Sequence, residues 1–423
     1  MKLLLSCFSC NPFGGSEAIY GWYVATALAK SHSCFVLMAD AEQSSIEKAR
    51  SMGMISPSMQ FKFISVKQGF HENRTIARYQ QWLRYVDYQA RLLAYAQDWH
   101  HEQGFDVAQH VTYTSWRVAS PLWQLGIPFI WGPISGTEVF PRSCLNSVSA
   151  GARAFEAVRN IQTWIARRSS SVAVCARNAA AIPAPHPQAV DFLSELRGTR
   201  SGVEISHNFF FPNHRVKELQ SARKNFGVSP HLRAFAAGNL EGRKGIAIAL
   251  MAIARAKRQG VRVEYRVTSR GPEYNHLRQL TKKLGLLDQV SLGLSFSSSE
   301  YVSQLGQYDI CLLPTLRDGG GLSIMEAMLA GCVPIVADWC GPGEAVTDEC
   351  GYKIPVTNPV EMAERISDIL CYLHTNRGEL ELKGKAASLR ISTDYSEDQF
   401  VRSMNKIYSR ALSASSGIAF CPV

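Results

Sequence analysis

The chain has 423 residues, of which 46% are apolar and 19% charged, and this length suits two or three domains. Such proportions are ordinary for a globular protein that buries a core. No run approaches the roughly 20 apolar residues of a membrane span, and the break at Asn11-Pro12 comes too early for a secretory leader. The composition therefore argues against a membrane-spanning or secreted protein.

The net charge is +10 and the pI is about 9.1. A basic balance suits anionic small molecules, nucleic acid or an anionic membrane surface. Because the basic residues are not gathered into low-complexity arms, nucleic acid is not favoured as a partner. The 11 cysteines are odd in number and scattered through predicted strands and helices, which argues against a disulfide framework. We therefore expect a reducing, cytoplasmic compartment.

The first half of the chain alternates apolar strands with helices. The apolar run at its start predicts a buried strand, and NPFGGSE then forms a glycine loop in front of a helix. A later strand of this half ends close to His110. Strands are predicted over residues 2–8, 35–38, 61–66, 107–113, 128–131, 171–175 and 203–206, and helices over 17–30, 74–103 and 120–125.

Residues 142–177 form a basic segment with apolar residues between the charges. Glu156 is its one acidic residue. This pattern is compatible with a helix that lies on an anionic membrane surface, and equally with a solvated basic face over a buried apolar one. The basic residues of the segment are Arg142, Arg153, Arg159, Arg167, Arg168 and Arg177.

The second half alternates strands and helices more regularly, which predicts a parallel sheet with right-handed crossovers. Strands are predicted over residues 234–237, 261–268, 290–292, 310–313 and 333–337, and helices over 246–258, 273–284, 300–305, 323–330, 361–373 and 396–412. We therefore predict an α/β fold of two domains, linked at or just after residues 207–213. Since open parallel sheets carry ligand loops at the carboxyl ends of their strands, the loops near Gly14 and Gly320 are expected to face each other across a cleft.

The stretch 308–344 combines a strand, a glycine loop, a helix and a second strand. The sequence from Asp318 to Gly321 cannot form regular structure, because three consecutive glycines lose too much backbone entropy. A bare glycine loop before a helix presents backbone N–H groups to a phosphate. Asp318 and Glu326 bracket this loop, and carboxylates suit the vicinal hydroxyls of a sugar. The stretch thus suits a nucleotide sugar, although a tight turn with Glu326 in solvent is the plain alternative.

These residues resemble the nucleotide-sugar glycosyltransferases of family four, which have the GT-B fold. The strongest match is the acidic pair Asp318 and Glu326, separated by seven residues and followed by EAMLAGCVPIVA. Further matches are NPFGGSE, the Gly132-Pro133 stretch, HNFFFP, KGIAIALMAIARAK, SRGPEYNHLRQLTKKLGLLDQVSLGL and DYSEDQFVRSMNKIYSRAL. The resemblance implies two Rossmann-like domains. They cover residues 1–206, completed by a C-terminal helix at about 396–415, and 207–395.

The resemblance also implies roles for individual residues. Asp318 orients the transferred sugar, and His110 lies near its anomeric carbon. Pro272 shares in the base pocket. The donor-binding residues are Gly14, Gly15, Arg243, Lys244, Gly271, Gly320, Gly321, Leu322, Ser323 and Glu326.

Two positions depart from the family pattern. Asp318 stands where glutamate is usual and is one methylene shorter. Asn239 stands five residues before Lys244, where arginine is usual. A lost charge-assisted contact is worth roughly 1.5–3 kcal/mol, and Arg243 or Arg317 are the possible replacements.

The implied chemistry needs neither a metal nor a cofactor. Fixed cations and backbone amides stabilise the charge that develops on the departing phosphate, and the chain contains no D-x-D metal motif. The resemblance implies retention at the anomeric carbon, with a donor phosphate oxygen accepting the acceptor's proton.

The expected function is hexosyl transfer from a nucleotide diphosphate sugar to a glycan or lipid-linked acceptor, in surface polysaccharide biosynthesis. The expected place is the cytoplasm, with peripheral contact with the inner membrane. The alternatives are a sugar-nucleotide epimerase of the same fold and a catalytically weak nucleotide-sugar-binding subunit. A dinucleotide dehydrogenase is disfavoured, because the first loop lacks G-x-G-x-x-G.

Overall fold

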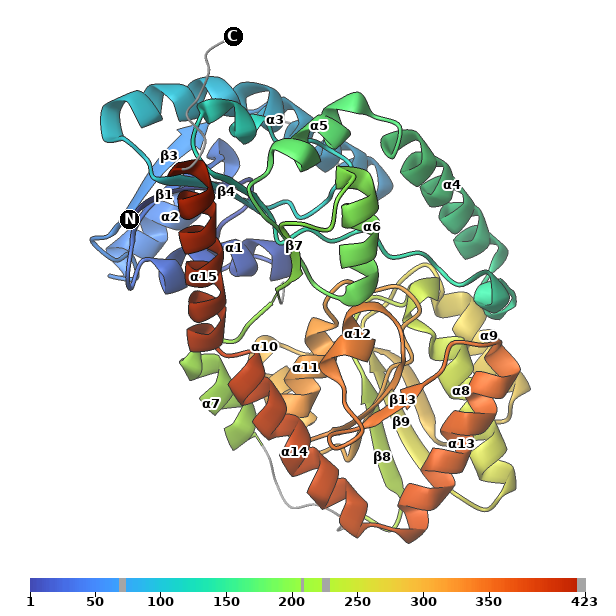
Figure 1. Cartoon of the computed structure of the whole chain (residues 1–423). Helices are drawn as coiled ribbons and strands as arrows, with labels where there is room; N and C mark the ends of the chain where they lie inside the picture. The colour runs from blue at the N-terminus through green and yellow to red at the C-terminus, as the bar shows by residue number, and fades with distance from the viewer. Residues whose placement is uncertain (68–73, 207–208, 223–228, 417–423) are drawn as a thin grey trace. The chain divides into compact units, whose positions relative to one another are not determined.

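The computed structural model describes residues 1–67, 74–206, 209–222 and 229–416. The chain forms two compact units (Figure 1). Unit 1 comprises residues 1–137, 163–208 and 397–423, and unit 2 comprises 138–162 and 209–396. Residues 138–162, assigned to the first domain from the sequence, thus cluster with unit 2. Residues 207 and 208 of the predicted link lie outside the described part of the chain.

Unit 1 is built on a five-stranded parallel sheet with the order β3-β2-β1-β4-β5. Its central strands are buried on both faces, which is why they consist of continuous apolar runs rather than alternating ones. A separate parallel pair, β6 and β7, belongs to the same unit. The strands are β1 Lys2–Cys7, β2 Ser33–Ala39, β3 Met59–Ile64, β4 Val107–Thr112, β5 Phe129–Trp131, β6 Ile182–Ala184 and β7 Val203–Ile205.

The helices of unit 1 connect these strands and cover the sheet (Figure 1). They are α1 Ser16–Leu28, α2 Gln43–Ser51, α3 Arg74–Gln103, α5 Ser170–Asn178, α6 Pro187–Arg197 and α15 Glu397–Ser416, with 3-10 turns η1 Asp40–Glu42 and η2 Pro121–Leu125. Helix α4, Ala150–Ala166, begins in unit 2 and ends in unit 1.

The strand predicted over residues 171–175 is wrong, because this segment lies within helix α5. Its buried residues are Val172, Cys175 and Ala176. Their spacing of three and four residues is that of one helical face. A short apolar run does not distinguish a strand from a buried helical turn by period alone, which explains the error.

Helix α15 returns from the end of unit 2 to pack in unit 1 (Figure 1). Its residues Met404, Ile407 and Tyr408 are buried. The hydroxyl of Tyr408 donates to the side-chain oxygen of Gln109 in β4. His32 Nε2 lies 2.7 Å from Asn405 Oδ1. The last helix is therefore part of the first unit's core.

Unit 2 contains a six-stranded parallel sheet with the order β10-β9-β8-β11-β12-β13. The strands are β8 Leu232–Ala236, β9 Val263–Thr268, β10 Val290–Leu294, β11 Ile310–Leu312, β12 Val333–Ala337 and β13 Tyr352–Ile354. The helices are α7 Asn213–Ser221, α8 Ile246–Arg258, α9 Tyr274–Lys283, α10 Ser298–Leu305, α11 Leu322–Leu329, α12 Cys340–Ala345, α13 Pro359–Thr375 and α14 Gly378–Asp394, with 3-10 turns η3 Arg142–Ser147 and η4 Gly242–Lys244.

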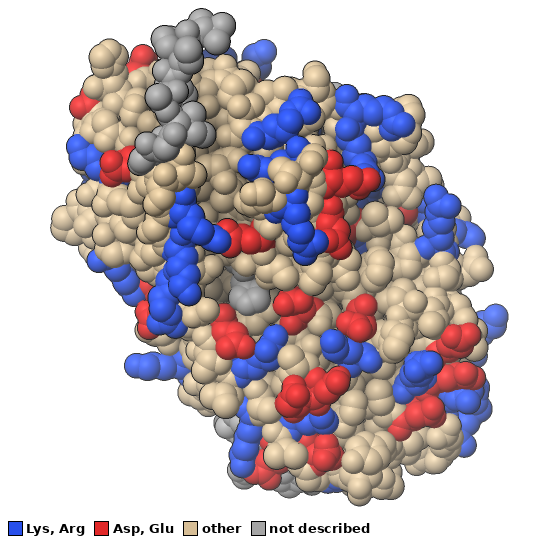
Figure 2. Space-filling model, viewed as in Figure 1, with Lys and Arg blue, Asp and Glu red and all other residues tan. Residues whose placement is uncertain are grey.

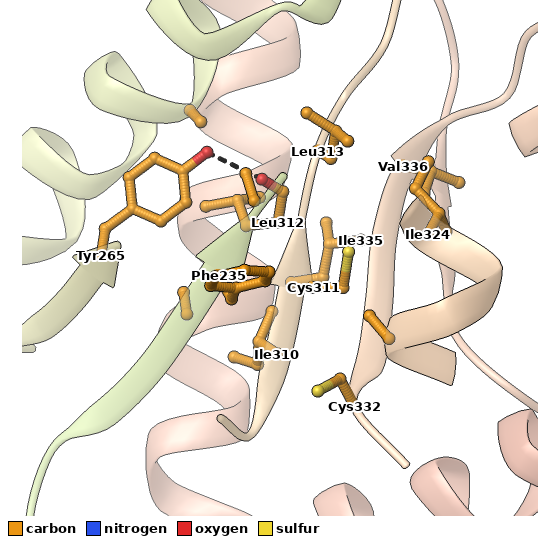
Figure 3. Close-up of a cluster of buried hydrophobic side chains, with 14 of the residues drawn as sticks. Phe235, Tyr265, Ile310, Cys311, Leu312, Leu313, Ile324, Cys332, Ile335 and Val336 are labelled. Atoms are coloured by element: carbon orange, nitrogen blue, oxygen red, sulfur yellow. Dashed lines mark hydrogen bonds between the residues drawn. The ribbon is translucent and has the colours of Figure 1, made fainter. Parts of the chain in front are cut away.

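The core of unit 2 holds β11 firmly in the middle of the sheet (Figure 3). Phe235, Ile310 and Ile335 are buried on the neighbouring strands β8, β11 and β12. The hydroxyl of Tyr265 in β9 reaches past β8 and donates to the carbonyl of Leu312, at 2.8 Å. This bond satisfies a buried hydroxyl and fixes the end of β11, where the glycine loop begins.

In each sheet, successive strands are first added on one side of the first strand and later on its other side. This change of side lies between β1 and β4 in unit 1 and between β8 and β11 in unit 2. Loops that leave the carboxyl ends of two such strands diverge to opposite faces and leave a crevice for ligands. In unit 2 these are the loop after β8, which contains Lys244, and the loop after β11, which contains Asp318.

The surface carries charges of both signs. On the face shown in Figure 2, Lys and Arg side chains are interspersed with Asp and Glu. No helix among the described residues is both long enough and apolar enough to span a membrane.

We predict that Tyr408→Ala destabilises unit 1 by about 3–5 kcal/mol, because it removes a buried ring and leaves Gln109 without this donor. Urea unfolding measures the loss. Lys406→Ala, on the exposed side of the same helix, is the control and should change the unfolding free energy by less than about 0.5 kcal/mol. Equal effects of the two variants would contradict the packing of α15 described above.

Candidate functional site

One partly buried carboxylate joins the two loops after β8 and β11 of unit 2. Asp318 Oδ2 lies 2.7 Å from Lys244 Nζ and 3.1 Å from Arg243 Nη1. Arg243 Nε also donates to Glu241 Oε2, at 2.6 Å. The structure thus brings together three of the predicted site residues, Asp318, Lys244 and Arg243.

The backbone fixes the same two loops against each other. The N–H of Leu316 donates to the carbonyl of Arg243 at 2.8 Å. Gly245 has φ +67°, and a Cβ at this position would lie 2.1 Å from the Pro314 carbonyl oxygen. Only glycine fits there, since both the left-handed backbone and the close approach exclude a side chain.

The pKa of Asp318 lies well below its usual range. Burial alone would raise this pKa, but the charges of Lys244 and Arg243 outweigh burial, and hydrogen bonds from Lys244 and the Gly321 N–H add to their effect. Asp318 is therefore ionised at every physiological pH and keeps both cations in place.

The glycine loop turns two of its own amides onto Asp318. Gly320 N and Gly321 N lie 3.3 and 3.1 Å from Asp318 Oδ1. Gly321, with φ +70°, is the N-cap of α11, so the N–H groups of Leu322 and Ser323 open this helix without an intrahelical acceptor. The hydroxyl of Ser323 donates to the carbonyl of Ala237 at 3.1 Å and ties the start of α11 to the end of β8.

A cavity of about 340 Å³ lies at the carboxyl ends of β8, β9 and β10, beside this loop. Its wall includes Glu326, from the second turn of α11, and the ring of Phe296. The other lining residues are Arg215, Ala237, Gly238, Thr268, Ser269, Leu294, Ser295, Ser297 and Tyr301. An opening of this size, with one acidic side chain and two aromatic rings, suits a polar aromatic ligand such as a nucleoside.

Glu326 is held by two partners at the cavity wall. Arg215 Nη2 donates to Glu326 Oε1 at 2.8 Å, and the Tyr301 hydroxyl donates to Oε2 at 3.1 Å. Arg215 Nη1 also donates to Glu218 Oε2 at 2.8 Å. Burial would lower the pKa of Arg215, but Glu326 and Glu218 raise it instead. Glu326 is thus oriented by its neighbours and is not a free surface carboxylate.

Ser269 lines the cavity in a left-handed backbone conformation, with φ +63°. Its N–H donates to the carbonyl of Leu294 at 2.6 Å. Positive φ is uncommon outside glycine, and residues held there cluster at ligand sites. This feature marks the loop after β9 as part of the same wall.

Gly271 and Pro272, predicted at the base pocket, are not among the residues that line the cavity. A Cβ on Gly271 would lie 2.5 Å from the carbonyl oxygen of Leu240 and 2.6 Å from its nitrogen. The glycine is needed here for close packing of the loop after β9 on the loop after β8.

The loop of unit 1 after β1 contains Gly14 and Gly15. A Cβ on Gly14 would lie 2.6 Å from the Cβ of Ala18, so the local packing requires glycine there. Gly15, the N-cap of α1, has φ −73° and nothing within 4 Å of its missing Cβ. The protein itself therefore does not require glycine at position 15. Two residues on, Glu17 accepts a hydrogen bond from the N–H of Thr114 at 3.1 Å.

His110 is buried at the end of β4, with Nε2 2.9 Å from the carbonyl oxygen of Tyr113. Burial lowers the pKa of His110 to about 4, although the Tyr113 carbonyl acts in the opposite direction. The imidazole is thus neutral near pH 7. Its predicted place near the transferred sugar stays a prediction.

The two candidate replacements for the missing arginine at position 239 differ in direction. Arg243 points to Asp318, as described above. Arg317 Nη2 instead pairs with Glu156 Oε1 of α4 at 2.7 Å. Asn239 itself is exposed. Arg243 is therefore the guanidinium that lies beside Lys244.

Sequence reasoning missed Arg215 and Tyr301, and the pairing of Glu156 with Arg317. Arg215 and Glu326 are 111 residues apart, so no local spacing reveals their contact. The only signal was the basic residue shortly after HNFFFP. Among the described residues, no group of three or more His, Cys, Asp or Glu is arranged to hold a metal ion.

Comparison with known proteins agrees with this geometry. Residues 221–371, which include Lys244, Asp318 and Glu326, match the family model of glycosyl transferases group 1. This segment is therefore similar to the group 1 glycosyl transferases. The narrower assignment to family four within this group stays a prediction.

Two curated relatives match part of the chain. A putative colanic acid biosynthesis glycosyltransferase, WcaL of Escherichia coli, is 27% identical over 181 residues, which are 41% of this chain and 44% of WcaL. A GDP-Man:Man(3)GlcNAc(2)-PP-Dol alpha-1,2-mannosyltransferase of Dictyostelium discoideum is 24% identical over 32% of this chain and 27% of its own length. The chain thus aligns with less than half the length of these relatives.

Solved structures match the whole chain and confirm the predicted fold. Anabaena Alr3699/HepE in complex with UDP superposes with a TM-score of 0.65 at 15% identity, covering 97% of this chain and 100% of that one. WaaG, a glycosyltransferase involved in lipopolysaccharide biosynthesis, gives a TM-score of 0.53 at 16% identity, covering 99% and 100%. The chain has the GT-B fold of these glycosyltransferases, and the segment that matches the group 1 model lies in unit 2.

We predict that Asp318→Asn destabilises unit 2 in a pH-dependent way, because it leaves Lys244 and Arg243 without their shared counter-charge. Asp318 has a lowered pKa in the fold, so its stabilisation is complete above the unfolded value of about 3.9 and disappears as pH falls towards the folded value. The difference in unfolding free energy between wild type and variant should be constant from pH 5 to 8 and shrink below about pH 4. Denaturant unfolding at a series of pH values measures it, and a difference that grew on acidification would contradict the ion pairs.

Proposed function

We propose that the protein transfers a hexose from a nucleotide diphosphate sugar to a glycan or lipid-linked acceptor. The observation that carries this proposal is Glu326, which is fixed by Arg215 and Tyr301 at the wall of a cavity beside the Lys244–Asp318 pair. The complexes of Alr3699/HepE with UDP and with UDP-glucose support a nucleotide-sugar donor.

The nucleoside occupies the 340 Å³ cavity in this proposal, and its ribose meets Glu326. A carboxylate has about four lone-pair sites. Arg215 takes one site on Oε1 and Tyr301 takes one on Oε2. Each oxygen keeps one site for a ribose hydroxyl, and Arg215 and Tyr301 act as positioning residues for Glu326.

The diphosphate lies between Lys244, Arg243 and the start of α11. The two cations and the free N–H groups of Leu322 and Ser323 supply positive charge from fixed positions. Such preorganised donors stabilise the negative charge that develops as the nucleoside diphosphate departs. Asp318 holds the cations, and its role in orienting the transferred sugar follows from the resemblance to family four.

Retention of the anomeric configuration also belongs to the proposal. In a retaining reaction of this kind, the acceptor attacks the anomeric carbon on the same face of the sugar from which the diphosphate leaves. A phosphate oxygen of the donor takes the acceptor's proton on that face. His110, neutral because burial lowers its pKa to about 4, donates or accepts hydrogen bonds and does not serve as a cation.

We further propose a role in surface polysaccharide biosynthesis, with the protein in the cytoplasm and in peripheral contact with an anionic membrane. The names of WcaL and WaaG, for colanic acid and lipopolysaccharide biosynthesis, support the process. The net charge of +10 supports contact with an anionic surface.

The decisive experiment incubates the protein with a panel of nucleotide sugars and lipid-linked saccharides, and measures both nucleoside diphosphate release and glycosylated product. Transfer from at least one donor is expected. A changed donor sugar without an acceptor product would favour the epimerase alternative. Binding without turnover would favour a weak binding subunit, and neither binding nor turnover would overturn the proposal.

We predict that Glu326→Gln weakens binding of the nucleoside diphosphate roughly ten- to hundredfold, because the amide has one acceptor oxygen fewer and removes the negative charge that pairs with Arg215. Isothermal titration calorimetry measures this. Glu218→Gln is the matched control, since Glu218 binds the same arginine but is half exposed and does not line the cavity. Equal losses in both variants would argue that the effect comes from Arg215 and not from contact with ribose.

We predict that Gly15→Ala weakens donor binding about tenfold, because the resemblance to family four gives Gly15 a role in donor binding and the new methyl group enters the open space before α1. Its effect on stability should stay within about 1 kcal/mol. Gly378→Ala is the control, because Gly378 also starts a helix with nothing within 4 Å of a Cβ. Unchanged donor affinity in Gly15→Ala would contradict the role given to this loop.

A further inference from the structure

Helix α4 presents an apolar stripe to solvent. The stripe consists of side chains that are each 54–60% exposed, namely Phe155, Val158, Ile161, Trp164 and Ile165. These residues follow one another at steps of three, three, three and one, which places them on one side of a helix. Figure 1 shows α4 as one continuous helix, so the stripe is a single surface of about 15 Å along its axis.

The opposite side of α4 already has a partner. Glu156 is buried there and pairs with Arg317 at 2.7 Å. Just before the helix, the N–H of Ser149 donates to Glu273 Oε2 at 3.1 Å. A solvated basic face over a buried apolar one, the alternative that the sequence left open, is therefore not what the structure has. The apolar side chains are on the outside, and the buried side is held by an ion pair.

Basic residues border the stripe. Arg168 stacks on the Trp164 ring, with 3.8 Å from its guanidinium carbon to the ring centroid, and Arg153 is exposed on the same helix. From residue 139 to residue 190 the sequence contains six arginines and a single acidic residue, Glu156, which is buried. The exposed charges of this segment itself are thus all basic, and among its arginines Arg167 pairs with an exposed acid, Glu195 of α6, at 2.5 Å.

We propose that the stripe of α4 docks the protein on an anionic lipid bilayer, with its apolar side chains in the interface and the arginines on the headgroups. A helix with these two features lies in the plane of a membrane surface, and basic residues near an anionic surface each add to the attraction. A second copy of the chain is a poorer partner, because pairing two such stripes would bring their arginines together.

Docking through α4 would also bring the loops that carry Arg243 and Asp318 to the membrane. Glu156 holds Arg317, the residue next to Asp318, and a Cβ on Gly242 would lie 2.9 Å from Val148 and 3.0 Å from Ala152. The start of α4 is thus packed on the loops that carry Arg243 and Asp318. This consequence rests on the proposed function, since it matters only if these loops bind the donor and the acceptor is lipid-linked. The docking itself does not depend on it.

Co-sedimentation with vesicles tests the proposal. One set consists of phosphatidylcholine alone and the other contains phosphatidylglycerol as well. The wild-type protein is expected to bind the anionic vesicles at least about tenfold more tightly than the neutral ones, and to be released by salt. The triple variant Phe155→Ser, Ile161→Ser, Ile165→Ser is expected to lose binding by about tenfold or more.

The matched control removes three other exposed apolar side chains, with Leu287→Ser, Leu382→Ser and Leu389→Ser, whose exposed fractions are 63%, 66% and 63%. It should bind like the wild type. A second variant, Arg153→Gln with Arg168→Gln, keeps the apolar stripe and should bind with a weaker salt dependence. Circular dichroism shows whether the serine variant folds. If it does not fold, the arginine variant still tests the proposal.

Several results would overturn the proposal. They are wild-type affinity in both α4 variants, equal losses in the α4 and control triple variants, and equal binding to neutral and anionic vesicles. A wild-type dimer without vesicles that the α4 serine variant converts to a monomer would assign the stripe to a second copy. Because the assay contains no donor or acceptor, its failure leaves the proposed transferase activity standing, and failure of transfer leaves the docking result standing.

Discussion

The bond between Asp318 and the cations of the neighbouring loop is the constraint on which unit 2 depends most. Lys244 and Arg243 would repel each other if they were buried without a counter-charge. Asp318 binds both cations with one oxygen and the amides of Gly320 and Gly321 with the other, and Glu241 gives Arg243 a second carboxylate partner. One carboxylate therefore fixes the positions of two loops and sets up a positive region at the start of α11. The short side chain of aspartate suits this role, because the loops come close enough to meet it.

The fold was largely predictable from the sequence because its sheets are buried and parallel. The strand over residues 333–337 and the helix over 246–258 were predicted with their observed limits, since long apolar periods and flanking glycines define them. Short elements were not predictable in this way. Strand β6 contains Pro183, which argues against a strand, and α5 has a run of small and β-branched residues that suits either state. In both cases contacts with distant parts of unit 1 decide the structure.

The site was predictable only where it is local in sequence. Asp318 and Glu326 belong to one glycine loop and its helix, so their spacing carries information. Arg215 meets Glu326 across 111 residues, and Glu156 meets Arg317 across 161. A single sequence does not show such pairs, because either partner alone is an ordinary surface residue. The sequence also does not show which side of α4 faces solvent. Periodicity predicts an apolar stripe, but whether the stripe faces the core or solvent depends on contacts with distant residues.

The path of the chain has a consequence for biosynthesis. Unit 1 comprises residues 1–137, 163–208 and 397–423, so its last helix is translated after all of unit 2. Until α15 has left the ribosome, the surface of unit 1 that receives Met404, Ile407 and Tyr408 has no cover. Unit 2 is complete earlier, at residue 396, although most of it comes later in the sequence. The nascent protein thus carries an unfinished amino-terminal half throughout synthesis, a period in which exposed apolar surface invites chaperones or aggregation.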